Sequence, residues 1–160
     1  MATDEQRFFE KRKAAAFVKH EILAGYLTPY AVKVGVSADD VVFVDGYAGP
    51  GAYDSGEPGS PEVALRASES IADYRVLRGH FIEQKKAFAQ ALEKHIAERS
   101  STGWMVHHGT AEQHLPTVLA DAGDSPLLIL LDPYGLAVPF DQLVDQVMGR
   151  TGITRMSRSS

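Results

Sequence analysis

A glycine-rich loop follows a short apolar run in the first third of the chain. The run Val41–Val44 leads directly into Asp45-Gly46-Tyr47-Ala48-Gly49-Pro50-Gly51. Glycines let a backbone turn tightly and approach a ligand closely. The spacing differs from the G-x-G-x-x-G pattern that cradles a pyrophosphate, and Pro50 removes a backbone donor. The loop therefore favours a ligand without a diphosphate, and a purely structural glycine turn is the alternative.

Two carboxylates and an aromatic ring follow later apolar runs. Glu83 ends the run 76–82, where a carboxylate can accept two hydrogen bonds from a ribose diol. Asp132 ends the run 127–131, and Tyr134 follows two residues on. A carboxylate there can accept a hydrogen bond from an amine while the ring stacks on a planar substrate. A solvated acid and a proline-closed turn are the simpler interpretations of these two positions.

Apolar patterning predicts the elements that must position these residues. The first is a helix from about 4 to 27, with Phe17, Ile22, Leu23 and Tyr26 in one apolar stripe. Thr28-Pro29 should break it, and a short helix should follow over 30–34. Strands are expected at 41–44, 76–82, 104–108 and 127–131. Helices are expected at 61–74, with Ser60 as N-cap and Pro61 in the first turn, and at 84–100, 111–122 (interrupted early by Pro116) and 140–148.

Strands that alternate with helices predict an α/β fold, a parallel sheet with helices on both faces. Ligands of such sheets bind beyond the carboxyl ends of the strands, at the topological switch point. The residues after each strand should therefore meet at one rim. They are Asp45 to Gly51, Glu83, His108 to Ala111, and Asp132 to Gly135.

The composition predicts a single soluble globular domain over 1–150, followed by a disordered tail over 151–160. Of the 160 residues, 44% are hydrophobic and 23% are charged. No apolar run approaches the roughly 18 residues of a membrane helix, and no signal-peptide core opens the chain, so we expect no membrane association. The absence of cysteine excludes disulfides and thiolate chemistry and fits a cytoplasmic protein.

Charge and histidine spacing argue against two further classes of site. The net charge of −5 gives no support for a free-standing nucleic-acid binder, and Lys11-Arg12-Lys13 is the only dense basic cluster. His107 and His108 are adjacent on a predicted strand and should point to opposite faces, which disfavours chelation of one metal ion. We expect no metal site.

The motifs together resemble class I S-adenosylmethionine-dependent methyltransferases, and more narrowly the three-Cys-motif partner family. The resemblance spans roughly 17–150. It rests on Lys19-His20-Glu21-Ile22-Leu23 with Tyr26-Leu27, Val44 to Gly51 with Tyr53, Gly56 to Pro61 (GEPGSP), Phe81-Ile82-Glu83, and Leu131-Asp132-Pro133-Tyr134-Gly135. It implies a Rossmann-like fold that binds S-adenosyl-L-methionine. Sheets of that class have seven strands, so a chain with four is expected to be C-terminally truncated.

The same order of motifs is similar to a family of ribosomal RNA methyltransferases that modify the exocyclic amine of adenine. This similarity implies that His20, Asp45, Tyr47, Gly49, Gly51, Ser60, Glu83, Gly109 and Thr110 line the cofactor pocket. It also implies that Asp132 accepts a hydrogen bond from the target amine while Tyr134 holds the base. Two positions depart from that family: Tyr47 replaces a histidine, and Asp132-Pro133-Tyr134-Gly135 has one proline fewer.

Three functions remain as hypotheses. The first is methyl transfer from S-adenosylmethionine to an amine of a nucleic acid, with RNA favoured. The second is a non-catalytic or truncated partner domain that acts through protein–protein contact. The third is a nicotinamide-dependent reductase, which the glycine spacing disfavours.

Overall fold

The fold is built on one four-stranded, all-parallel sheet with the strand order β3-β2-β1-β4. The computed structural model describes residues 4–53, 56–99, 102–132, 145 and 147–149. The strands are β1 (Asp40–Asp45), β2 (Val76–Glu83), β3 (Trp104–His108) and β4 (Leu127–Leu130). The order reverses at β1, which lies between β2 and β4. The predicted α/β fold is thus confirmed, and it is compatible with a Rossmann-like architecture.

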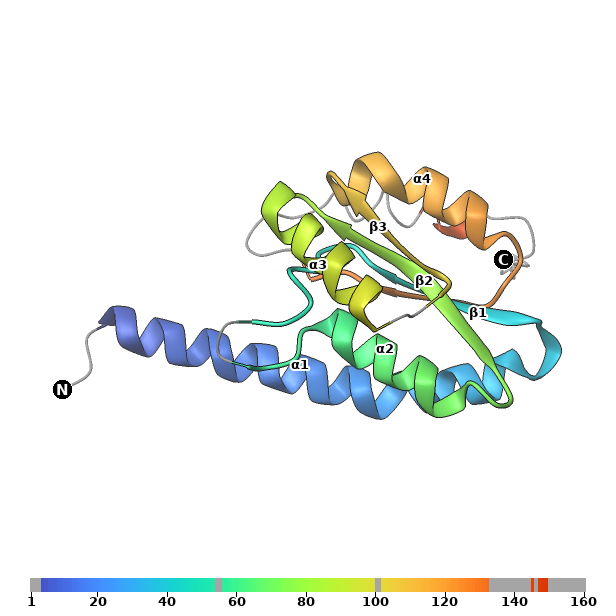
Figure 1. The fold of residues 1–160 in the computed structure, drawn as a ribbon, viewed down its shortest axis with the longest axis horizontal. Helices are drawn as coiled ribbons and strands as arrows, with labels where there is room; N and C mark the ends of the chain where they lie inside the picture. Colours follow the sequence, from blue (N-terminus) through green and yellow to red (C-terminus); the bar gives the residue numbers. More distant parts are fainter. Residues whose placement is uncertain (1–3, 54–55, 100–101, 133–144, 146, 150–160) are drawn as a thin grey trace, which may run out of the picture.

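Helices cover both faces of the sheet, as Figure 1 shows. One face is covered by α1 (Asp4–Val34), α2 (Ser60–Ile71) and α3 (Lys86–Glu98), and the other by α4 (Ala111–Ala122). A short 3-10 turn, η1 (Gly35–Ser37), joins α1 to β1. Alternate side chains of a strand point to opposite faces, so Val42 and Val44 pack under α4 while Phe43 points towards α1 and α2.

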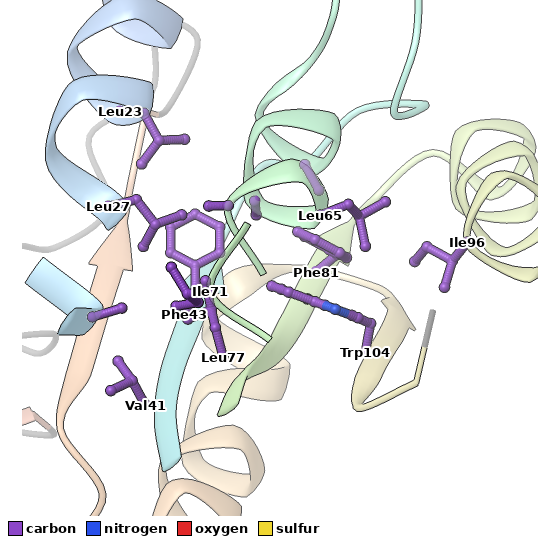
Figure 2. Packing of buried hydrophobic residues seen from close by; sticks show 14 of the residues in the cluster. Leu23, Leu27, Val41, Phe43, Leu65, Ile71, Leu77, Phe81, Ile96 and Trp104 are labelled. Carbon is purple, nitrogen blue, oxygen red and sulfur yellow. The ribbon is translucent and has the colours of Figure 1, made fainter. Parts of the chain in front are cut away.

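The larger core lies between the sheet and the three helices on its first face (Figure 2). Phe43 contacts Phe81 edge-on with ring centroids 6.4 Å apart, and Phe81 stacks on Trp104 at 5.0 Å. Leu27 of α1 and Leu65 of α2 are fully buried against this aromatic row. Burying a leucine or phenylalanine side chain contributes roughly 1.5–3 kcal/mol, so the burial of this row stabilises the packing of the helices on the sheet.

The N-terminal helix is one element and not two. The sequence predicts a break at Thr28-Pro29, but α1 continues to Val34 with Pro29 inside it. The predicted apolar stripe is also wrong in part: Leu23 is buried, whereas Phe17, Ile22 and Tyr26 are exposed. The buried positions of the described part of α1 are Leu23, Leu27 and Ala31. Their burial on either side of the proline offsets the hydrogen bond that Pro29 cannot donate.

The remaining boundaries follow the predictions within a few residues. Strand β3 and helix α4 begin and end at the predicted residues, and α4 runs on through Pro116 because Leu115, Val118 and Leu119 are buried on both sides of it. The helix predicted at 140–148 and the tail at 151–160 lie almost entirely outside the described residues. Across the described residues, no helix combines the length and apolarity needed to cross a membrane.

Candidate functional site at the carboxyl rim of the sheet

The glycine loop and Glu83 meet at the carboxyl ends of β1 and β2. The Glu83 carboxylate accepts a hydrogen bond from the Gly49 N–H at 2.8 Å through Oε2, and from the Lys85 N–H at 2.7 Å through Oε1. The side chain is buried at the end of its strand. Each carboxylate oxygen has a second lone pair, so both oxygens can still accept a hydroxyl from a ligand.

Asp45, at the end of β1, fixes the beginning of the same loop through hydrogen bonds. It is buried, and its Oδ1 accepts the Tyr47 N–H at 2.9 Å while its Oδ2 accepts the Ser60 hydroxyl. Gly59, not Ser60 as predicted, is the N-cap of α2 because the Ser60 hydroxyl is directed to Asp45. Burial raises the pKa of Asp45 to about 6, although its two hydrogen bonds oppose the shift. Asp45 therefore holds the loop in its conformation and does not form part of the exposed surface of the site.

Two glycines of the loop adopt left-handed conformations. Gly49 has φ 69° and Gly51 has φ 89°, a region that other residues rarely enter. A Cβ at Gly51 would approach Leu92 at 3.0 Å and His95 at 3.3 Å, so the loop also packs tightly on α3. A Cβ at Gly49 would meet the Tyr53 hydroxyl at 3.3 Å. Sequence reasoning did not place Tyr53 at this position beside the bend.

The turn after β3 joins the same rim. The Gly109 N–H donates to the Glu83 carbonyl at 3.0 Å, which fastens this turn to the end of β2. Thr110 caps α4 in a capping box: its Oγ1 accepts the Gln113 N–H at 3.3 Å, and its own N–H donates to Gln113 Oε1 at 2.9 Å. The Thr110 side chain is therefore already committed to the helix end.

Asp132 forms an ion pair with Lys19 of α1. Both side chains are partly exposed at the end of β4, next to the glycine loop. His20 lies close enough to Lys19, Glu57 and Asp132 to feel their charges, and burial is the main reason that its pKa is lowered. His20 is therefore neutral at pH 7. Tyr134, the predicted aromatic partner of Asp132, lies outside the described residues.

A series of hydrogen-bonded polar side chains under α4 was not predicted from the sequence. His80 of β2 is buried and bonds Asp121 at 2.9 Å through Nε2 and His107 at 2.9 Å through Nδ1. The His107 ring lies 5.1 Å from that of His114 on α4. The only sequence feature that pointed to this series was the presence of His80 and His107 in two predicted strands that follow one another. Among the described residues, no group of three ligating side chains is arranged to hold a metal ion.

The rim thus gathers most of the predicted site residues. Glu83 is hydrogen-bonded to Gly49 and Gly109, and Asp45 is hydrogen-bonded to Ser60. Asp132 and His20 lie beside them on the β4 side. Tyr47 is half-buried between this loop and α4, where burial raises its pKa. A scan of protein-family models and a search of curated proteins found no match to this chain.

The raised pKa of Asp45 predicts a pH dependence of stability. The folded protein retains this proton up to about pH 6, whereas the unfolded chain releases it near the ordinary value of 3.8. Between these pH values the folded state binds more protons, so the free energy of unfolding falls as pH rises. Asp45→Asn should remove this pH dependence. Over the whole range, the dependence lowers the free energy of unfolding by up to about 3 kcal/mol.

Urea unfolding at several pH values between 3.5 and 7 measures the difference between the two proteins. Asp40→Asn is the matched control because Ser125 and Arg78 lower the pKa of Asp40, which gives the opposite sign. If the free energy of unfolding of the wild type varied with pH in parallel with that of Asp45→Asn, the raised pKa of Asp45 would be wrong.

Proposed function

We propose that this domain binds S-adenosyl-L-methionine at the carboxyl rim and transfers its methyl group to an amine of a nucleic acid, with RNA as the favoured substrate. The observation that carries the proposal is the contact between Glu83 and Gly49. This hydrogen bond keeps the Glu83 carboxylate, a group of the type that binds ribose, against the glycine bend. The bend follows β1, the strand at which the order of the sheet reverses.

The residues present fit an adenosyl ligand in three respects. Glu83 keeps free lone pairs for a ribose diol. The left-handed Gly49 is only half-buried and carries no side chain over the bend, and Pro50 beside it offers no donor to a diphosphate. Asp45 and Ser60 keep the bend in place without reaching solvent.

The substrate side of the site is Asp132 with Lys19. The Asp132 carboxylate forms an ion pair with the Lys19 ammonium, and a carboxylate is a strong acceptor for an N–H of an amine. Accepting that N–H orients the nitrogen lone pair for in-line attack. S-adenosylmethionine, when bound, supplies an electrophilic methyl group on sulfur. The protein contributes mainly positioning, which is worth about 7–11 kcal/mol in ideal cases.

One observation favours the second candidate, a partner domain that binds the cofactor without catalysis. Lys19 occupies the Asp132 carboxylate, so an incoming amine must share or displace this ion pair. The two functions differ in a single measurement. Incubation with methyl-tritiated cofactor and total RNA, DNA or protein labels one of these fractions if the domain is an enzyme, and labels none if it is a partner domain.

Glu83→Gln should weaken the binding of S-adenosylmethionine and of its demethylated product at least tenfold, or about 1.4 kcal/mol. The amide removes the charge and one of the two acceptor atoms while it keeps the size of the side chain. Isothermal titration calorimetry measures both ligands, with NAD as the competing cofactor class.

Glu98→Gln is the matched control because Glu98 is an exposed acid at the end of α3. Tight binding of NAD, or equal affinity of both variants for S-adenosylmethionine, would overturn the proposed cofactor.

A further inference from the structure

A histidine of α3 packs against the glycine bend. A Cβ on Gly51 would come within 3.3 Å of Cδ2 and 3.5 Å of Cγ of the His95 ring, so the ring touches the backbone of Gly51. Gly51 is buried, and its carbonyl accepts the N–H of Gly59, the N-cap residue of α2, at 2.9 Å. The position of Gly51 is therefore set by α2 and α3 together.

Glu62, in the first turn of α2, fixes the orientation of the His95 ring. Its Oε2 lies 2.8 Å from His95 Nε2, and its Oε1 accepts hydrogen bonds from Arg66 Nε at 2.7 Å and from Arg99 Nη1 at 2.5 Å. Although burial opposes the shift, these hydrogen bonds lower the pKa of Glu62. The ionised carboxylate can only accept, so His95 carries its hydrogen on Nε2 and donates it to Glu62.

These contacts form a closed series that includes the bend. The series runs from Gly51 through its hydrogen bond to Gly59, along the first turn of α2 to Glu62, across to His95 and back to Gly51. Helix α3 is also attached to Glu83, because the N–H of its N-cap residue Lys85 donates to the Glu83 carboxylate at 2.7 Å. One helix therefore contacts both the proposed ribose acceptor and the bend.

We propose that His95 is a positioning residue for cofactor binding: held by Glu62, it keeps Gly51 in the conformation that receives S-adenosylmethionine. This inference rests on the proposed function, because it assigns a role to the same site. His95 acts on the cofactor only through the backbone of the bend. A ligand that meets a preformed bend does not have to order it, so a loosened bend should bind the cofactor more weakly.

The same two helices carry a matched comparison. Arg99 of α3 also pairs with Glu69 of α2, at 2.7 Å. Glu69 lies two turns further along α2 than Glu62, so this pair joins the helices away from the bend. A role that is only structural would be shared by both pairs, whereas a positioning role belongs to His95 and Glu62 alone.

Isothermal titration calorimetry of the full chain with S-adenosylmethionine and with its demethylated product tests the proposal. His95→Leu fills the space but cannot donate to Glu62, and it should raise both Kd values roughly fivefold or more. His95→Gln restores an N–H donor of similar reach and should stay within about twofold of the wild type, as should Glu69→Gln. Thermal melts show that the variants are folded, and Glu62 keeps both arginine partners in each of them.

Amide hydrogen exchange followed by NMR gives a second readout that needs no ligand. The Gly59 N–H reports on the bend, and the Gly79 N–H, which donates to the Gly103 carbonyl at 2.9 Å, reports on opening of the sheet. In His95→Leu the Gly59 amide should exchange about tenfold faster relative to that of Gly79, whereas in Glu69→Gln this ratio should equal that of the wild type.

Equal cofactor affinity of the wild type and His95→Leu, or a loss of affinity that Glu69→Gln shares, would overturn the positioning role. If the wild type itself binds no S-adenosylmethionine, the proposed function fails and amide exchange alone decides whether His95 holds the bend. An unchanged ratio of Gly59 to Gly79 exchange in His95→Leu would then refute that part as well.

Discussion

Asp132→Ala should abolish methyl transfer while it leaves the affinity for S-adenosylmethionine within about tenfold, or about 1.4 kcal/mol. The carboxylate lies just after β4, at the part of the rim proposed to receive the substrate, whereas Glu83 and the glycine bend form the part proposed to hold the cofactor. Its loss removes the proposed acceptor of the amine and spares the groups proposed to hold the cofactor. Tritium transfer to the labelled fraction measures the first effect, and calorimetry measures the second.

Two controls separate catalysis from folding in this experiment. The Lys19–Asp132 pair is partly exposed, so breaking it should cost at most about 1 kcal/mol of stability. A thermal melt of Asp132→Ala checks this. Asp132→Asn retains the shape but removes the charge, and it should also lose most of the transfer. Undiminished transfer by either variant would exclude Asp132 as the substrate acceptor.

Gly79→Ala should destabilise the fold by at least about 3 kcal/mol. A Cβ on Gly79 would lie 2.0 Å from the Phe43 carbonyl oxygen and 3.0 Å from the Trp104 ring. Neither neighbour can yield easily, because the oxygen belongs to the backbone of β1 and the ring is stacked on Phe81. Strands β1 and β2 would have to separate at the centre of the sheet. Urea unfolding measures the loss as a lower midpoint.

Gly25→Ala is the matched control for that substitution. A Cβ at Gly25 meets nothing within 4 Å, and the residue lies in the interior of α1. Alanine restricts the unfolded chain and favours the helix, so this variant should be more stable by about 0.5–1 kcal/mol. A similar change in both variants would mean that the sheet does not close on Gly79 as described.

The sequence predicted the sheet well because its signals are local. A strand such as Trp104–His108 is a short apolar run between turn residues, and its limits are visible without a tertiary context. The behaviour of Pro29 was not predictable in this way. Whether a helix survives a proline depends on the burial of residues on both sides, here Leu27 and Ala31. That burial is set by distant parts of the chain.

The positions of the site residues were more predictable than their hydrogen-bond partners. Parallel strands bring their carboxyl ends to one rim, so Glu83 was expected near the glycine loop. The pairing of Asp132 with Lys19 joins residues far apart in the sequence, and no local sequence pattern indicates it. The burial of Asp45 was hidden for the same reason, because it depends on how α2 docks with Ser60.

The chain of polar groups under α4 has a direction. Arg78 and His80 lower the pKa of Asp121, so its carboxylate only accepts, and His80 must carry its hydrogen on Nε2. His80 Nδ1 is then an acceptor and takes the Nε2 hydrogen of His107. Both imidazoles are thereby confined to one tautomer, and His107 Nδ1 is the single nitrogen of the pair still able to take up a proton. The hydrogen bonds beneath α4 therefore all point one way, from His107 through the buried His80 to the partly exposed Asp121.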